Sequence, residues 1–284
     1  MRISLHATAN IVRFGQRSEA KGMAMIEGIK RRIKGLLKGR GYTLFWSPLS
    51  AVNGFDFARD LKILIPKEDP LCLDVGANVG QTIEYLQTIF TSPTIHAFEP
   101  ASAPFKELQS KAYGERVSLF NFALGNEITS REFINYEQSV LSSFHAFDVN
   151  PENRFRQIRV KDKQTVEVKT VDWFLQTKNI EHVDLLKIDA QGSDLQVLKG
   201  STESLRRGLI ENVFVEVNFV QLYENQDDAG EIFDLLAGHD MRLVDFYEKA
   251  RQDHALAWCT SLYTKRRSVH DAPAAQPRRD GDPD

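Results

Sequence analysis

The stretch Asp74-Val-Gly-Ala-Asn-Val-Gly80 has the residue types of a tight turn between a strand and a helix. It follows the apolar run 71–75, a predicted buried strand, and leads into 79–90, a predicted helix. Ligands of open α/β sheets bind at the carboxyl ends of strands, and Gly76 can adopt dihedrals closed to other residues there. The candidate ligand contacts in this turn are Asp74, Gly76, Ala77, Asn78, Gly80 and Gln81.

The spacing of the glycines excludes two common phosphate-binding loops. A dinucleotide fingerprint starting at Gly76 requires glycines at positions 78 and 81, where this chain has Asn78 and Gln81. No Gly-Lys-Ser/Thr sequence of a P-loop follows either. The turn therefore suits a ligand without a pyrophosphate, such as a nucleoside. The alternative is a plain strand–helix turn that needs two glycines.

Glu99 and Pro100 end the next predicted strand, 94–98. A carboxylate offers two oxygens, so Glu99 is predicted to accept hydrogen bonds from both hydroxyls of a ribose. Pro100 fixes the backbone where the chain leaves the strand. The alternative for Glu99 is an acid that begins the following helix, but its place after the glycine turn favours the ribose.

A second group of ionisable residues surrounds the end of a later predicted strand, 183–188. Asp189 follows this strand directly, and Lys187 shares a face with it. Glu216 lies near the end of the neighbouring predicted strand, 212–217, and is expected to meet Asp189 across the crevice. Two close carboxylates raise one pKa, which suits a general base, or they bind a divalent metal. For Lys187, the favoured interpretation is a partner for a nearby acid.

His145 is the third candidate base, after Asp189 and Glu216. It lies in a long polar stretch, 138–163, and stretches of that length in compact domains are usually functional or disordered. A lone loop histidine is more often simply solvated. The remaining histidines show no metal-ligand spacing, and no residue is assigned as a metal ligand.

The elements that position these residues alternate between strand and helix, which predicts a parallel sheet with helices on both faces. Predicted strands cover 71–75, 94–98, 117–122, 183–188, 212–217, 242–247 and 257–263. Predicted helices cover 55–65, 79–90, 101–112, 171–176, 195–205 and 230–237. Two short β segments, 132–135 and 165–169, flank the long polar stretch, and the last two strands are expected to form an antiparallel hairpin.

Composition is that of an ordinary globular protein, with 42% hydrophobic and 26% charged residues. The sequence shows no apolar run long enough to span a membrane and no secretory signal pattern. Cys72 and Cys259 lie far apart in apolar runs, which predicts buried thiols and a reducing, cytoplasmic setting.

The charge is uneven, because residues 1–43 are strongly basic while the whole chain carries a net charge of −3. Helical spacing of isoleucines and leucines at 26–38, with basic residues between them, suggests weak contact with an anionic membrane surface, which could place the protein at the inner face of the membrane. The rival interpretation is an ordinary amphipathic helix packed on the domain. We divide the chain into a basic helical extension (1–68), a ligand-binding domain (69–264) and a disordered tail (265–284).

Several segments in this order resemble the FkbM-type S-adenosylmethionine-dependent methyltransferases. The similar segments are Leu73-Asp-Val-Gly-Ala-Asn-Val-Gly-Gln81, Ala97-Phe-Glu-Pro100, Phe122-Ala-Leu-Gly125, Ser142-Ser143, Val168-Lys-Thr-Val-Asp172, Leu186-Lys-Ile-Asp-Ala-Gln-Gly192, Val197-Leu-Lys-Gly200 and Val215-Glu-Val217. The departures, Ala190-Gln191 and Asp194 where Val-Glu and Glu are commoner, leave the central aspartate and glycine in place.

The resemblance implies a Rossmann-like class I methyltransferase with a mostly parallel seven-stranded sheet. It implies S-adenosylmethionine as cofactor, with Glu99, Pro100, Ala123 and Asp189 joining the turn residues as cofactor contacts. The expected reaction is O-methylation of a sugar, glycolipid or natural-product hydroxyl. The alternatives are an N-methyltransferase and a non-catalytic S-adenosylmethionine-binding protein. The acidic excess outside the basic extension argues against a nucleic-acid partner.

Overall fold

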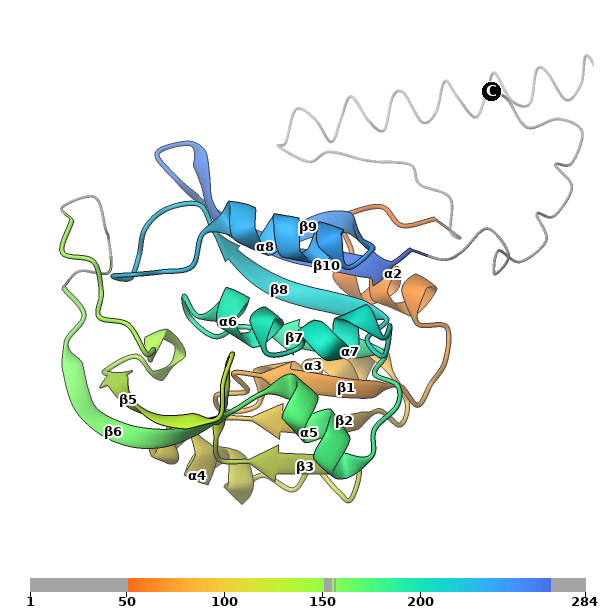
Figure 1. Cartoon of the computed structure of the whole chain (residues 1–284), viewed down its shortest axis with the longest axis horizontal. Helices are drawn as coiled ribbons and strands as arrows, with labels where there is room; N and C mark the ends of the chain where they lie inside the picture. The colour runs from red at the N-terminus through yellow and green to blue at the C-terminus, as the bar shows by residue number, and fades with distance from the viewer. Residues whose placement is uncertain (1–50, 151–154, 156, 267–284) are drawn as a thin grey trace, which may run out of the picture. The chain divides into compact units, whose positions relative to one another are not determined.

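The computed structural model describes residues 51–150, 155 and 157–266. The main sheet within these residues has seven strands in the order β3-β2-β1-β7-β8-β10-β9 (Figure 1). Five neighbouring strands are parallel, and β10 runs antiparallel to β8 and β9. Their bounds are β1 Leu71–Val75, β2 Thr94–Phe98, β3 Val117–Phe120, β7 Leu185–Ile188, β8 Asn212–Asn218, β9 Met241–Gln252 and β10 Ala255–Lys265. The predicted fold class and closing hairpin are confirmed.

Helices cover both faces of this sheet (Figure 1). One face packs against α5 Val171–Lys178, α6 Asp194–Lys199, α7 Thr202–Arg206 and α8 Ala229–Gly238. The other packs against α2 Phe57–Leu64, α3 Gln81–Ile89 and α4 Ser102–Ser110. Because side chains alternate along a strand, Leu73 and Val75 of β1 enter the first core, whereas Cys72 enters the second. The face that Leu73 and Val75 enter is covered by helices from the later half of the chain, and the opposite face by helices from the earlier half.

Helix α2 is anchored to the sheet by a buried carboxylate. Asp60 accepts hydrogen bonds from the backbone N–H of Gly54 at 2.8 Å and from the Tyr247 hydroxyl of β9 at 2.8 Å. Leu61 is fully buried beside it. This helix thus packs with the sheet, although the sequence assigned it to the extension; the division at residues 68 and 265 stays a prediction.

A second sheet of three strands, in the order β4-β6-β5, lies beside the carboxyl ends of the main strands (Figure 1). Its strands are β4 Ala123–Leu124, β5 Thr129–Tyr136 and β6 Val160–Lys169, and the single-turn helix η1 Ser139–Leu141 follows β5. The predicted β segments 132–135 and 165–169 were shorter than β5 and β6. The predicted polar stretch 138–163 was placed too far along the chain at its end, because β6 already begins at Val160. Exposed polar residues along most of β6 hide its strand pattern.

Several predictions fall on other parts of the chain. The basic segment 26–38 and most of the predicted tail lie outside the described residues. No helix among the described residues is long and apolar enough to cross a membrane. Cys72 and Cys259 are both buried and unpaired, as predicted.

Candidate active site

The turn after β1 is held in place by backbone contacts from two other strands. Gly76 and Ala77 donate their N–H groups to the Phe98 carbonyl, each at 3.0 Å. Gly76 has φ 77°, and a Cβ atom there would lie 2.0 Å from the Asp189 carbonyl oxygen. Glycine is required at this position for both its conformation and its close approach to the end of β7.

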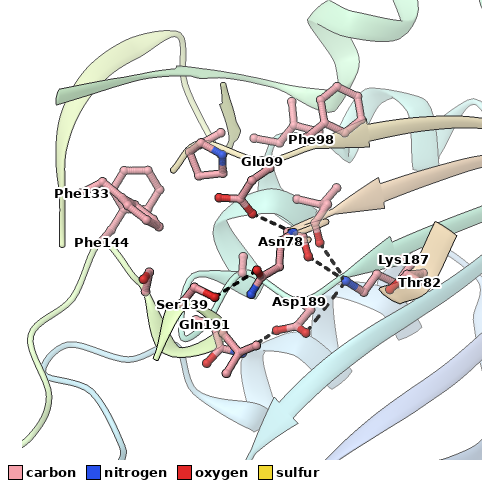
Figure 2. Close-up of a pocket in the computed structure, with 18 of the residues that line it drawn as sticks. Asn78, Thr82, Phe98, Glu99, Phe133, Ser139, Phe144, Lys187, Asp189 and Gln191 are labelled. Atoms are coloured by element: carbon pink, nitrogen blue, oxygen red, sulfur yellow. Dashed lines mark hydrogen bonds and ion pairs between the residues drawn. The ribbon is translucent and has the colours of Figure 1, made fainter. Parts of the chain in front are cut away.

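Asn78 explains how the turn forms without the second glycine of a dinucleotide loop. Its φ is 47°, in the left-handed region that asparagine tolerates better than most residues. Its side-chain oxygen accepts a hydrogen bond from the Ser139 hydroxyl of η1 at 3.2 Å (Figure 2). The side chain thereby connects the turn to the segment that follows β5.

Glu99, at the end of β2, is held by two backbone donors. Its oxygens accept hydrogen bonds from the N–H of Asn78 at 2.8 Å and from that of Ala101 at 2.7 Å. Burial raises the pKa of Glu99 to about 7, although these hydrogen bonds and Lys187 favour the charged form. Each oxygen keeps further acceptor capacity, so the carboxylate can still bind donors within the cavity.

Asp74 and Lys187 form a buried ion pair beneath the turn. Lys187 Nζ lies 3.0 Å from Asp74 Oδ1 and donates to the Gly76 carbonyl at 3.2 Å. Burial lowers the pKa of Lys187, but attraction to Asp74 and Asp189 outweighs burial and leaves this pKa above its usual value. The favoured interpretation of Lys187 is confirmed, since its charge is neutralised by an acid of the neighbouring strand.

Asp189 and Glu216 are linked by an amide. Gln191 Nε2 donates to Asp189 Oδ1 at 2.6 Å and to Glu216 Oε2 at 3.1 Å. The Tyr223 hydroxyl in turn donates to Gln191 Oε1 at 2.8 Å. Burial, followed by the charges of Asp189 and Asp194, raises the pKa of Glu216 well above its usual value. The Asp189 side chain is 41% exposed, so of the two carboxylates it is the one open to a ligand.

These residues surround a cavity of about 260 Å³ at the carboxyl ends of β1, β2 and β7. Thr82 and Lys187 lie at one end of it, and Phe133 and Phe144 lie at the other, toward the second sheet (Figure 2). The rings of Phe133 and Phe144 pack edge to face, with centroids 5.0 Å apart. The cavity therefore has a polar end beside Asp189 and an aromatic end beneath β5.

The structure brings together most of the predicted site residues. The predicted residues that line the cavity are Gly76, Asn78, Gln81, Glu99, Pro100, Ala123 and Asp189. Asp74, Ala77 and Gly80 lie outside its lining: Asp74 pairs with Lys187, and Ala77 is 1% exposed. Gly80 begins α3, where a Cβ atom would meet the Tyr113 hydroxyl at 1.9 Å.

Two of the three candidate bases do not line this cavity. Glu216 stands behind Asp189 through the Gln191 bridge. His145 is also absent from the lining, and its Nε2 lies 2.9 Å from the Ser193 hydroxyl. Burial and the charge of Arg131 lower the pKa of His145. Asp189 is thus the only candidate base that lines the cavity within the described residues.

Sequence reasoning missed the aromatic end of the cavity. Phe133, Ser139, Ser142 and Phe144 come from β5 and the segment after it, and all four line the cavity. Two signals marked the region: the length of the polar stretch and the Ser142-Ser143 pair within it that resembles the family. Gln191 was also missed as a contact, although it sits within the segment that resembles the family.

The described residues contain no group of three or more His, Cys, Asp or Glu side chains arranged to hold a metal ion.

Comparisons with known proteins find several methyltransferases. "Methyltransferase 1" of Beauveria bassiana is 29% identical over 167 residues, which cover 53% of this chain and 65% of that protein. The 2-O-methyltransferase NoeI of Sinorhizobium fredii is 24% identical over 192 residues, covering 64% of this chain and 77% of NoeI. The 31-O-demethyl-FK506 methyltransferase FkbM of Streptomyces tacrolimicus is 28% identical over 194 residues, which cover 60% of this chain and 72% of that protein. This chain thus spans slightly less than two thirds of the fungal relative.

The sequence model of the methyltransferase FkbM domain matches residues 74–243. The match begins at the aspartate of the glycine turn and takes in Glu99, the second sheet, Asp189 and Glu216. It covers more than half of the chain, which therefore belongs to the FkbM family of methyltransferases.

Proposed function

We propose that this protein transfers a methyl group from S-adenosylmethionine to a hydroxyl oxygen of a sugar, a glycolipid or another small natural product. The observation that carries the proposal is the cavity that joins Glu99 at the end of β2 to Asp189 at the end of β7. A cofactor seated between these carboxylates reaches a residue able to take a proton.

The residues of the cavity fit this cofactor. Glu99 offers oxygens to a ribose diol, and Phe98, Pro100, Ala123, Leu124, Phe133 and Phe144 form an apolar wall that suits the adenine ring. Lys187 is the single cation among the described lining residues, and Asp74 already neutralises it. Such a lining offers no free cation to a pyrophosphate, whereas a phosphate-free nucleoside has no such need.

Asp189 is the group we assign to proton transfer. Bound S-adenosylmethionine supplies an activated methyl group, so the chain itself must orient the acceptor and exclude water. An alcohol is a poor nucleophile, and loss of its proton near the transition state increases its reactivity. Asp189 can accept this proton, while Gln191 fixes the orientation of its carboxylate. Glu216 acts through that amide as a positioning residue.

The names of the relatives support an oxygen acceptor. NoeI is a 2-O-methyltransferase, FkbM of Streptomyces tacrolimicus acts on 31-O-demethyl-FK506, and AglP of Haloferax volcanii, 23% identical over 152 residues, is a hexuronic acid methyltransferase. FK506 and a hexuronic acid are chemically different acceptors, so the names support the reaction type, and the acceptor of this chain has to be argued from its own residues.

Calorimetry on the purified full chain tests the proposal directly. S-adenosylmethionine and its demethylated product, S-adenosylhomocysteine, are expected to bind, whereas NAD is not, because the turn lacks the glycines of a dinucleotide loop. NAD binding without binding of either sulfur nucleoside would contradict the proposal.

An assignment to the inner face of a membrane rests on residues 26–38 alone. We propose that this basic segment gives weak, salt-sensitive contact with the anionic inner surface of a membrane, each basic residue contributing about 1 kcal/mol at most. Flotation with anionic and neutral vesicles measures it. Absence of binding to anionic vesicles at low salt would remove the membrane contact, and loss of folding on deletion of residues 1–41 would favour the packing interpretation.

A further inference from the structure

A second cavity, of about 150 Å³, adjoins the cofactor cavity. It lies on the sheet face covered by α2 and α3, and its walls include Phe57, Tyr85, Phe214, Glu248 and Thr260. Thr82, Lys187 and Asp189 line both cavities and stand together at the polar end of the first (Figure 2). A molecule in the second cavity therefore meets the residue to which we assign proton transfer.

The strand register places three polar residues in a row, and the two outer ones, Asp189 and Thr260, line the second cavity. Ile188 is aligned with Val215, so Asp189 follows at the level of Glu216. Glu216 is in turn aligned with Thr260 of β10. Asp189, Glu216 and Thr260 thus occupy neighbouring positions on three adjacent strands, at the end of the sheet where the cofactor cavity lies.

The opposite wall of the second cavity is aromatic. The Phe57 ring stacks on the Phe214 ring with centroids 4.2 Å apart and planes at 23°. Tyr85 continues the stack beyond Phe57 at 6.1 Å and 25°, and it is 44% exposed. The negative π face of such rings attracts the positively polarised C–H face of a saturated ring. An exposed aromatic ring at the edge of a cavity is suited to that contact.

Glu248 reaches this cavity through an irregular backbone. Its φ is 50°, which is unusual for a residue with a side chain, and the pairing of β9 with β10 shifts register between Trp258 and Thr260. Such irregularities re-aim side chains and are common next to active sites. The Thr260 hydroxyl donates to Glu248 Oε2 at 2.8 Å, which leaves Oε1 able to accept a hydrogen bond from a ligand.

The charges around the second cavity disfavour an anion. Asp189 and Glu248 are acidic, and the one basic lining residue, Lys187, is already paired with Asp74. Burial, then the charges of Asp56 and Glu248, raises the pKa of the nearby Tyr85 hydroxyl. A carboxylate or phosphate in this cavity would face the same repulsion.

We propose that the second cavity is the acceptor subsite, and that it takes a neutral pyranose-type ring whose C–H face packs on the exposed Tyr85 ring while one hydroxyl hydrogen-bonds Glu248. This assignment rests on the proposed methyl transfer and specifies its acceptor class. The ring's reacting hydroxyl lies toward Asp189, and a uronic acid is excluded by charge.

Saturation-transfer NMR on the full chain, with S-adenosylhomocysteine present, tests this assignment. The probes are the methyl glycosides of glucose, mannose and galactose, with methyl glucuronide as the charged analogue. We expect at least one neutral probe to receive saturation and the glucuronide to bind about tenfold more weakly or not at all. Equal or tighter binding of the glucuronide would overturn the neutral assignment.

Two pairs of variants locate the binding. Glu248→Gln retains the acceptor for Thr260 but loses the charge-assisted hydrogen bond, so the affinity for the neutral probe should fall about tenfold. Glu231→Gln on α8, on the other face of the sheet, should have no effect. Tyr85→Ala should weaken the same probe, whereas Phe219→Ala should not. Unchanged probe affinity in both Glu248→Gln and Tyr85→Ala would overturn the assignment.

Calorimetry with S-adenosylhomocysteine separates this inference from the proposed function. Wild type, Glu248→Gln and Tyr85→Ala should bind the product alike, which also shows that the variants are folded. Failure of the wild type to bind it would defeat the proposed function. Normal product binding with no saturation of any neutral probe would defeat the acceptor assignment alone.

Discussion

Glu99 and Asp189 are both carboxylates at the carboxyl ends of parallel strands, yet they are held in different ways. Glu99 accepts hydrogen bonds from two backbone N–H groups, those of Asn78 and Ala101. Asp189 is held by side chains, Gln191 at 2.6 Å and Lys187 at 3.9 Å. A carboxylate fixed by backbone suits a binding role with constant geometry, whereas one held by side chains can change its orientation as its neighbours adjust.

The largest effect is expected from Asp189→Asn. The substitution keeps the volume and an acceptor for Gln191 but removes the proton-accepting charge, so turnover should fall by about 10²–10⁴-fold. The measurement is labelled methyl transfer to an acceptor that the wild type methylates, together with the melting temperature, which should change little. Turnover near the wild-type value would remove Asp189 from the mechanism and shift attention to Glu216.

Glu99→Ala should weaken binding of the cofactor more than binding of the acceptor. Loss of its charge-assisted hydrogen bonds should weaken S-adenosylhomocysteine binding by about 2–3 kcal/mol, measured by calorimetry. Glu107→Ala, an exposed position on α4, is the matched control and should bind normally. Unchanged affinity in a folded Glu99→Ala protein would show that Glu99 only begins the following helix.

Binding of the cofactor product should depend on pH through Glu99. Because burial raises the pKa of Glu99 to about 7, the group is protonated below that pH and then accepts ribose hydroxyls poorly. The affinity for S-adenosylhomocysteine should therefore fall about tenfold between pH 8 and pH 6. Glu99→Gln should show a flat profile over this range. An equally steep profile in that variant would assign the titration to another group.

In the protein without ligand, the raised pKa of Glu99 affects folding stability in the opposite direction to binding affinity. Glu99 binds its proton more tightly when folded than when unfolded, so its contribution to stability decreases as pH rises from about 4.5 to about 7. The melting temperature of Glu99→Gln should accordingly increase relative to that of the wild type as pH rises through this window.

The smallest effect is expected from Ser139→Ala. The exposed Ser139 hydroxyl donates to Asn78 Oδ1 at 3.2 Å, and this bond connects the segment after β5 to the glycine turn. Its loss should change S-adenosylhomocysteine affinity by less than about threefold. A much larger loss of affinity would mean that the segment after β5, and not the turn, orders the cofactor.

The family predicted from the sequence is confirmed. The cofactor side of the site was predictable because its contacts are local or lie between consecutive elements: Glu99 contacts residues 78 and 101, and Asn78 replaces glycine within one turn. The second sheet was predicted poorly, since polar residues along β6 obscure its alternation. Phe133 and Phe144 were therefore missed as lining residues.

The sequence by itself determined the parallel sheet, the turn after β1 and the placement of acids at strand ends, since short-range spacing specifies these features. Only the tertiary structure decided that Lys187 is neutralised by Asp74, that Gln191 joins Asp189 to Glu216, and that Glu248 turns toward Thr260. These contacts depend on the register between strands and on a shift in the β9–β10 pairing. Long-range packing sets that register, and the pattern along any one segment does not encode it.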